Sequence, residues 1–147
     1  MLIFHRRWSV NFFTGCNDYH VLNDETRNSG YGYDGMGFCD KTGVDYSSDL
    51  SPDWHGPGWY RLGMPAGTTI PEEPVEPNHC NTGATGWLNG THPTTPHTTV
   101  SRTVCFNYAN NSCDWQINIQ IRNCGGFYVY NLPKTPACSL RYCAVNE

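Results

Sequence analysis

The chain has 147 residues, a length that suits one domain and leaves little room for two. Hydrophobic residues make up 38% of it and charged residues only 15%, while 15 glycines and 10 prolines indicate abundant turns around a modest core. A net charge of −4, with nine basic residues scattered mostly singly, argues against nucleic-acid binding, and no run approaches the roughly 18 apolar residues of a transmembrane helix.

The first 15 residues contain no cysteine and are rich in apolar side chains. Trp8, Val10 and Phe12 alternate with polar residues, which is the period of a half-buried strand. Two interpretations are open: the strand packs on its own domain, or it forms an arm that pairs with the edge of a neighbouring copy. We therefore divide the chain into an arm, 1–15, and a domain, 16–147. The apolar side chains of the arm that need cover are Leu2, Ile3, Phe4, Trp8, Val10, Phe12 and Phe13.

The first half of the domain is rich in turn-forming residues. The stretch 20–27 predicts one short helix that begins at Asn23 or Asp24. Residues 59–62 predict a strand. Residues 65–79 hold four prolines and three glutamates and predict an extended loop.

The second half of the domain shows the period of β-strands. Residues 86–88 predict a short strand, and 100–108, 115–122 and 127–132 predict three more. The clearest alternation is that of Ile117, Ile119 and Ile121 with polar neighbours. The expected fold is a small β-rich domain, all-β to α+β, stapled by four disulfides, with long loops and at most one or two short helices.

Eight cysteines in so short a chain are typical of a disulfide framework, and zinc thiolates are the alternative. Zinc sites usually contain close Cys-x2-Cys pairs, and this chain has none. Disulfides are therefore favoured, and with them a secreted, extracellular protein, although Arg6 and Arg7 follow the first apolar residues instead of preceding them as in a signal peptide. Spacing alone leaves more than a hundred pairings open. The cysteines are Cys16, Cys39, Cys80, Cys105, Cys113, Cys124, Cys138 and Cys143.

No constellation of residues predicts catalysis, a metal site or a cofactor, so we expect a protein that is not an enzyme. The six histidines are dispersed and are interpreted as surface residues: His5, His20, His55, His79, His92 and His97. Four aspartates recur in one stretch without the EF-hand arrangement, which favours a solvated acidic loop over a weak calcium site: Asp40, Asp45, Asp49 and Asp53. Three tryptophans in strand-like motifs are expected in the core: Trp59, Trp87 and Trp115.

Five motifs occur in a characteristic order from residue 16 onward. They are 16–24 (CNDYHVLND), 58–62 (GWYRL), 87–93 (WLNGTHP), 113–115 (CDW) and 126–132 (GFYVYNL). Together they resemble the cysteine-rich module, of eight- or ten-cysteine type, of the uromodulin and pancreatic secretory granule glycoprotein family. The resemblance covers about 16–143, which is essentially everything except the arm.

The resemblance implies a β-rich fold and a particular disulfide pairing: Cys16 with Cys124, Cys39 with Cys138, Cys80 with Cys143, and Cys105 with Cys113. The ten-cysteine version has one more bridge, and Pro74 and Ser112 stand here where its two ends are expected. Losing both ends together leaves no odd thiol. The stretch 41–56 is longer than the family's link into its Trp-Tyr-Arg strand, so an extra loop is expected.

The resemblance also implies a secreted, N-glycosylated module with a structural or adhesive role. Its partners would be further copies of itself, through the arm and into filaments, or other extracellular glycoproteins. The alternative is a glycan-presenting decoy of innate defence that binds microbial lectins. Covalent N-glycans, and no cofactor, are expected.

Two sequons fall in turn-prone positions, at Asn89 and Asn110. A third family position, Asn131, cannot be an acceptor because Pro133 stands where Ser or Thr is required. This departure weakens the decoy interpretation, since the resemblance implies that the glycan at this position is the one that presents mannose to bacterial adhesins. A Thr/Pro cluster is either a plain solvated loop or a site of O-glycans at Thr94, Thr95, Thr98 and Thr99.

Overall fold

The computed structural model describes residues 15–35, 37–41 and 49–147. The predicted arm before Gly15 lies outside the described residues, and with it Leu2, Ile3, Phe4, Trp8, Val10, Phe12 and Phe13. The described part contains nine strands and a single turn of 3-10 helix, η2 (Glu25–Arg27). The strands are β1 (His20–Leu22), β2 (Phe38–Cys39), β3 (Asp49–Leu50), β4 (Gly58–Leu62), β5 (Ala84–Asn89), β6 (Thr99–Tyr108), β7 (Asn111–Asn123), β8 (Tyr128–Leu132) and β9 (Leu140–Tyr142).

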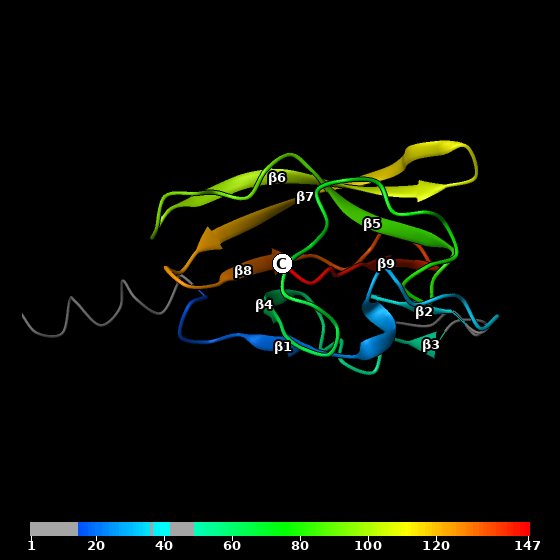
Figure 1. Ribbon diagram of the computed structural model, residues 1–147, viewed down its shortest axis with the longest axis horizontal. Helices are drawn as coiled ribbons and strands as arrows, with labels where there is room; N and C mark the ends of the chain where they lie inside the picture. The colour runs from blue at the N-terminus through cyan, green and yellow to red at the C-terminus, as the bar shows by residue number, and fades with distance from the viewer. Residues whose placement is uncertain (1–14, 36, 42–48) are drawn as a thin grey trace, which may run out of the picture.

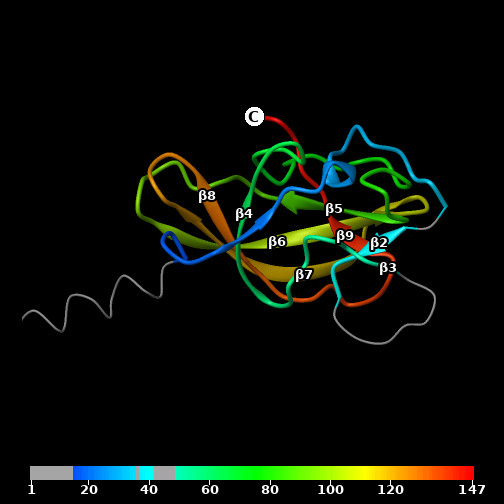
Figure 2. The same ribbon diagram turned by 90° about the horizontal axis from the view of Figure 1, so that it is seen from below.

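Seven of the strands form one mixed sheet in the order β1-β4-β8-β7-β6-β5-β9, and β2 pairs with β3 in parallel beside it. The five inner strands pair antiparallel, whereas both edge strands pair parallel with their neighbours. Figure 1 shows the long hairpin of β6 and β7 along the top, with β4 and β1 below it and the β2–β3 pair at the lower right. Figure 2 shows the same hairpin running across the molecule.

The observed elements match the β-rich fold that the sequence predicts. The five predicted strands are confirmed as β4 to β8. The short helix predicted in the stretch 20–27 is found as the 3-10 turn η2, which begins after Asp24, one of the two predicted N-termini, while residues 20–22 form β1. Asp24 is the N-cap of that turn, and its side chain accepts a hydrogen bond from the Thr26 amide at 2.9 Å. The sequence does not predict β1, β2, β3 or β9.

The alternation along β7 determines which face of the sheet is covered. Ile119 and Ile121 are buried on the core side, whereas Asn118 and Gln120 are exposed on the other. Complete burial of one such side chain contributes about 1.5–3 kcal/mol. The same core includes Trp54, whose ring stacks on Tyr60 with centroids 4.9 Å apart. Of the three tryptophans expected in the core, Trp87 is buried, Trp115 packs against the core from its edge, and Trp59 is half-buried.

The proline-rich loop 65–79 crosses the edge of β5 and closes one side of the core. β9 pairs only with residues 84–86 of β5. Farther along β5, the Leu88 amide donates to the Pro71 carbonyl of the loop at 2.7 Å. Ala66 and Ile70, which belong to this loop, are buried. β9 itself lies so close to β5 that a Cβ on Gly86 would come within 2.7 Å of the Arg141 carbonyl oxygen. The loop is therefore a structural cover, although it has no regular secondary structure.

All eight cysteines are in disulfides, which join Cys16 to Cys124, Cys39 to Cys138, Cys80 to Cys143 and Cys105 to Cys113. These are the four pairs that the resemblance implies. Three of them close segments of 108, 99 and 63 residues, and the fourth closes a segment of 8. By loop-closure entropy each long bridge stabilises the domain by about 4–5 kcal/mol and the short one by about 2.5.

Candidate functional site

The first sequon lies at the end of a central strand. Asn89 is the last residue of β5 and is exposed, as are Gly90 and Thr91 after it. Gly90 has a φ of 149°, a conformation that other residues rarely adopt, so the chain turns sharply away from the sheet here. The Thr91 carbonyl accepts a hydrogen bond from the Arg102 Nε at 2.9 Å. The acceptor amide is thus presented on a fixed strand end and is open to solvent.

The second sequon lies at the tip of the β6–β7 hairpin. Ala109 and Asn110 form a two-residue turn between the paired residues Tyr108 and Asn111, and Ala109 has a φ of 53°. The Cys105–Cys113 disulfide closes the hairpin below this turn. Asn110 is exposed, so this acceptor amide also faces solvent on a cross-linked element.

The position that lacks a sequon lies inside the sheet. Asn131 is half-buried near the end of β8, and its Nδ2 donates to the Gln120 Oε1 at 3.4 Å. Pro133, the residue that removes the sequon, offers its carbonyl to the Tyr142 hydroxyl at 2.7 Å. The side chain of Asn131 therefore belongs to a row of polar groups across the strands.

The Thr/Pro loop between β5 and β6 is exposed but anchored. Thr94, Thr95 and Thr99 are exposed, whereas Thr98 is half-buried and its hydroxyl donates to the Thr95 carbonyl at 2.6 Å. The loop is tied down by Asn123, whose side chain donates to the Pro93 carbonyl at 2.9 Å. O-glycosylation at these threonines stays a prediction, for which the engaged hydroxyl of Thr98 is the least suited.

Two of the four aspartates are buried, so the prediction of a solvated acidic loop is wrong for Asp40 and Asp53. Both bind the buried guanidinium of Arg27, with Asp40 Oδ2 2.7 Å from Nη1 and Asp53 Oδ2 3.1 Å from Nε. Burial alone would raise the pKa of the Asp53 carboxyl, but Arg27 outweighs it and lowers that pKa below its usual value. Burial likewise opposes the charge of Arg27, and its two carboxylate partners raise its pKa. The side chains of Asp45 and Asp49 lie outside the described residues.

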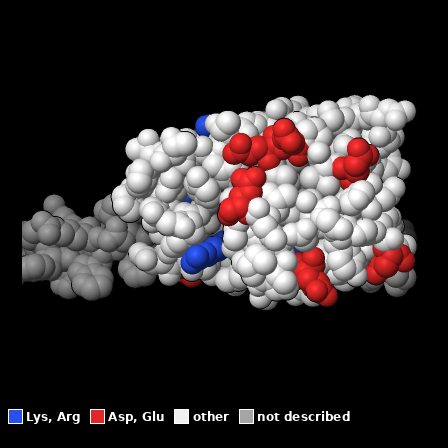
Figure 3. Space-filling model, viewed as in Figure 1, with Lys and Arg blue, Asp and Glu red and all other residues white. Residues whose placement is uncertain are grey.

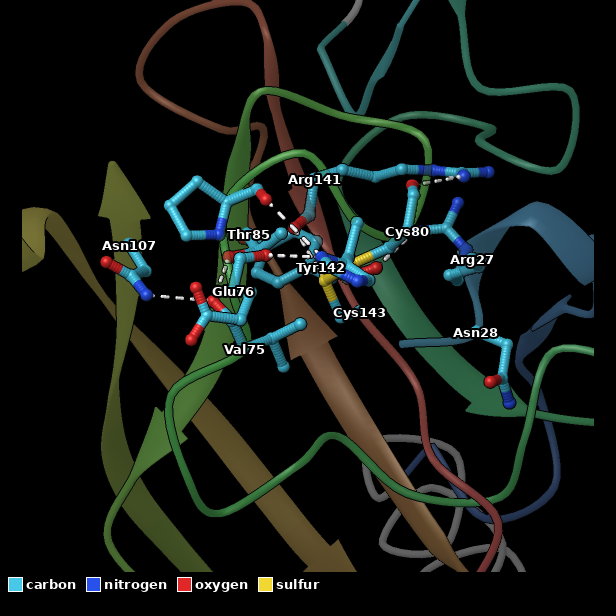
Figure 4. The surroundings of a disulfide bond; sticks show 12 residues. Arg27, Asn28, Val75, Glu76, Cys80, Thr85, Asn107, Arg141, Tyr142 and Cys143 are labelled. Carbon is cyan, nitrogen blue, oxygen red and sulfur yellow. Dashed lines mark hydrogen bonds between the residues drawn. A yellow bond between two sulfur atoms is a disulfide. The ribbon is translucent and has the colours of Figure 1, made fainter. Parts of the chain in front are cut away.

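A second buried arginine, Arg141 of β9, joins this cluster to a disulfide. Its Nη1 donates to the carbonyl of Cys80 at 2.9 Å, and its Nε donates to the Ser51 hydroxyl at 3.0 Å. Burial, and then repulsion from Arg27, lower the pKa of Arg141 to about 10, so it remains charged at neutral pH. Figure 4 shows Arg27 and Arg141 beside the Cys80–Cys143 disulfide. The cluster is therefore a structural junction in which all the buried charges are paired.

One histidine is buried, which corrects the interpretation of all six as surface residues. His92 lies between two partners: its Nδ1 is 2.5 Å from the Glu72 Oε2, and its Nε2 is 2.8 Å from the Tyr130 hydroxyl. Tyr130 also accepts a hydrogen bond from the Ile70 amide at 3.2 Å, and burial raises its pKa. The hydrogen bond from His92 lowers the pKa of Glu72. The group joins the proline-rich loop to β8 and lacks a nucleophile.

The other histidines fit the prediction of surface residues more closely. His20, His55 and His97 are exposed, His79 is partly buried, and His5 lies outside the described residues.

The described surface offers little for metals or polyanions. Across residues 15–35, 37–41 and 49–147, no three His, Cys, Asp or Glu side chains come together in an arrangement that could hold a metal ion. The face in Figure 3 carries several separate acidic groups and few basic ones. In the same part of the chain, no helix has the length and apolar character needed to cross a membrane.

The amino-acid sequence of this chain is similar to those of known proteins. Residues 60–144 match the family model of the uromodulin-like domain. Uromodulin of Rattus norvegicus is 40% identical over 129 residues, which is 87% of this chain and 18% of that protein. The chain belongs to the uromodulin-like domain family. The pancreatic secretory granule membrane major glycoprotein GP2 of Canis lupus familiaris is 41% identical over 129 residues, 87% of this chain and 23% of that protein. GP2 of Homo sapiens is 34% identical over 134 residues, 90% of this chain and 22% of that protein.

Membership of this family places the chain among extracellular glycoprotein modules, as the cysteines predict. The chain spans about a fifth of the length of these relatives. The functions of the full-length relatives are therefore not assigned to this chain. The residues of the site that sequence reasoning missed are the buried partners Arg27, Arg141 and His92.

Proposed function

We propose that this uromodulin-like domain is a non-catalytic extracellular structural or adhesive module that carries N-glycans at Asn89 and Asn110. The observation that carries the proposal is the placement of both acceptors. Each is exposed, and each lies at an end of a regular strand, one of them in a disulfide-closed hairpin. Sequons in exposed turns of secreted proteins are the ones that are usually modified.

The test is site-resolved detection of glycans on the secreted protein. Peptide-N-glycosidase treatment in heavy-oxygen water marks each former glycan site, and we expect marks at Asn89 and Asn110 but not at Asn131. Asn131 serves as the control, since it lies on the same sheet without a sequon. An unmarked Asn89 would remove the central part of the proposal, and a marked Asn131 would overturn the sequon argument.

Self-assembly through the arm is the finer part of this proposal. β1 is an edge strand with Val21 41% exposed, so it offers a backbone with which a strand from another copy could pair. A head-to-tail exchange of this kind generates an open filament. Removing residues 1–13 should abolish assembly and leave a folded monomer with four disulfides, as measured by native mass spectrometry. A full-length protein that stays monomeric at high concentration contradicts this part alone.

The alternative function, a decoy that presents glycans to microbial lectins, is favoured by one feature. The Asn110 turn is the exposed tip of a long hairpin, where a glycan would be accessible to a large partner. The loss of the Asn131 sequon counts against it. Binding of intact microbes to the purified glycoprotein, lost on Asn110→Gln, would favour this alternative over a structural role.

A further inference from the structure

The solvent side of the sheet carries a continuous patch of uncharged polar side chains, the amide face: Ser101, Thr103, Asn118, Gln120 and Asn131. Ser101, Gln120 and Asn131 lie opposite one another on β6, β7 and β8, and Thr103 lies opposite Asn118 in the adjacent row. Two hydrogen bonds link them, from Thr103 Oγ1 to Asn118 Oδ1 at 3.3 Å and from Asn131 to Gln120 at 3.4 Å. Each amide still has donor and acceptor positions to offer to a ligand.

The amide face is hollowed. A depression of about 340 Å³ lies over Ser101, Asn118, Gln120 and Asn131, and it is also lined by Pro57, Ile119, Leu132 and Pro133. This volume is within the range of small-molecule sites, which begins at about 300 Å³. None of the residues that line it is charged. The chemistry of this hollow therefore suits a neutral ligand with many hydroxyl groups.

Asn89 begins on this same face. In register, Asn89 of β5 lies opposite Thr103 of β6, which lies opposite Asn118 of β7, so the three side chains share one side of the sheet. Neighbouring strands are about 4.8 Å apart, so Asn118 is roughly 10 Å from the attachment point. Asn110 is farther away, because Asn118 is seven residues along β7 from the hairpin turn, or roughly 23 Å.

We propose that the amide face is the binding site of the glycan attached to Asn89. The inference rests on the proposed modification of that residue. The glycan would leave the end of β5, cross Thr103 and hydrogen-bond through its hydroxyl groups to Asn118, Gln120 and Asn131. Asn110, at the tip of the hairpin, is more than twice as far from the amide face. The two sites therefore differ: the amide face holds the Asn89 glycan and does not hold the Asn110 glycan.

The test compares how fast peptide-N-glycosidase releases each glycan from the native, secreted, full-length protein. In the wild type we expect the Asn89 glycan to be released roughly tenfold more slowly than in the double variant Asn118→Ala/Gln120→Ala, since the enzyme reaches only the undocked glycan. Release from Asn110 in the same molecules is the internal control and should not change. Asn23→Ala, which removes an exposed amide near the opposite edge of the sheet, should leave both rates as they are.

Each outcome separates the two proposals. Equal release from Asn89 in the wild type and the double variant overturns the docking inference and leaves glycosylation intact. An Asn89 that carries no glycan overturns the proposed function and the inference with it. A double variant that changes the assembly state but not the release rate identifies the amide face as a contact between copies, which also overturns the inference. Circular dichroism and disulfide mapping verify that the variants fold.

Discussion

Two regions of this domain are held together by different means. The hairpin region, β5 to β7, is held by a long regular ladder and needs only one short disulfide. The junction region, defined as residues 24–53 in their described parts together with β9, has strands of two or three residues. One long disulfide reaches it at Cys39 and another at Cys143, directly after β9, and the region also holds the buried Arg27 pairs. Short strands cannot supply the cooperativity of a long ladder, so cross-links and paired charges take its place.

The largest effect should come from breaking a long cross-link of the junction region. Replacing both Cys80 and Cys143 by serine removes a bridge that closes 63 residues and should cost about 4 kcal/mol. Replacing both Cys105 and Cys113 removes a bridge that closes 8 residues and should cost about 2.5 kcal/mol. Urea unfolding measures both free energies.

Hydrogen exchange locates the two losses. We expect the Cys80/Cys143 variant to lose protection first in the junction region, while amides of β6 and β7 remain protected. The Cys105/Cys113 variant should lose protection only near the hairpin tip. Equal costs, or uniform loss of protection in both variants, would show that the two regions are not held differently.

The next largest effect concerns the buried charges. Arg27→Ala leaves the carboxylates of Asp40 and Asp53 without their main partner and should destabilise the domain by about 3 kcal/mol. This is near the lower end of the usual cost because Arg141 lies 3.9 Å from Asp53 and compensates in part. Thermal unfolding gives the value.

The matched control for Arg27→Ala is Arg102→Ala. Arg102 also hydrogen-bonds a carbonyl, that of Thr91, but this contact in the hairpin region is exposed to solvent. Arg102→Ala should lower the free energy of unfolding by less than about 1 kcal/mol. If the two substitutions cost the same, the buried pairs contribute no more than surface polar contacts.

The same contrast explains what could be predicted from the sequence. β6, β7 and β8 are long enough for their alternation to be visible, and Ile119 and Ile121 face the core as their period predicts. β1, β2, β3 and β9 are too short to show a period and exist because of their neighbours. The pairing of the cysteines came from family resemblance, since spacing alone leaves it open.

Buried polar residues were the part that sequence reasoning missed. Arg27 and Asp53 are separated by 26 residues, and nothing in the spacing links them. Arg141 had a local signal, since it stands between Leu140 and Tyr142 in a segment that is buried throughout. An arginine between large apolar residues is a candidate for a buried pair. His92 had no comparable signal, because a residue beside a proline in a Thr-rich loop is typical of a surface turn.

The smallest effect should be the pH dependence of the contact between Glu72 and His92, which closes the proline-rich loop. The pKa of Glu72 is lowered by its hydrogen bonds to His92, so the folded state favours the charged carboxylate. This contribution to stability is present above the ordinary glutamate pKa of about 4.5 and is lost as the pH falls below it. Because the Glu72 side chain is 42% exposed, the contribution should be less than about 1 kcal/mol.

The substitution Glu72→Gln tests the direction of this pH dependence. The variant should be less stable than the wild type at pH 7 and approach it at pH 3, in urea unfolding curves recorded at both values. The pKa of Asp53 is also lowered, so protonation of Asp53 in acid destabilises both proteins equally. The difference between their free energies of unfolding therefore reports on Glu72 alone. Glu73→Gln, at the exposed neighbouring position, is the control and should leave the pH dependence unchanged. A difference between Glu72→Gln and wild type that is as large at pH 3 as at pH 7 would mean that the carboxylate acts through packing and not through its charge.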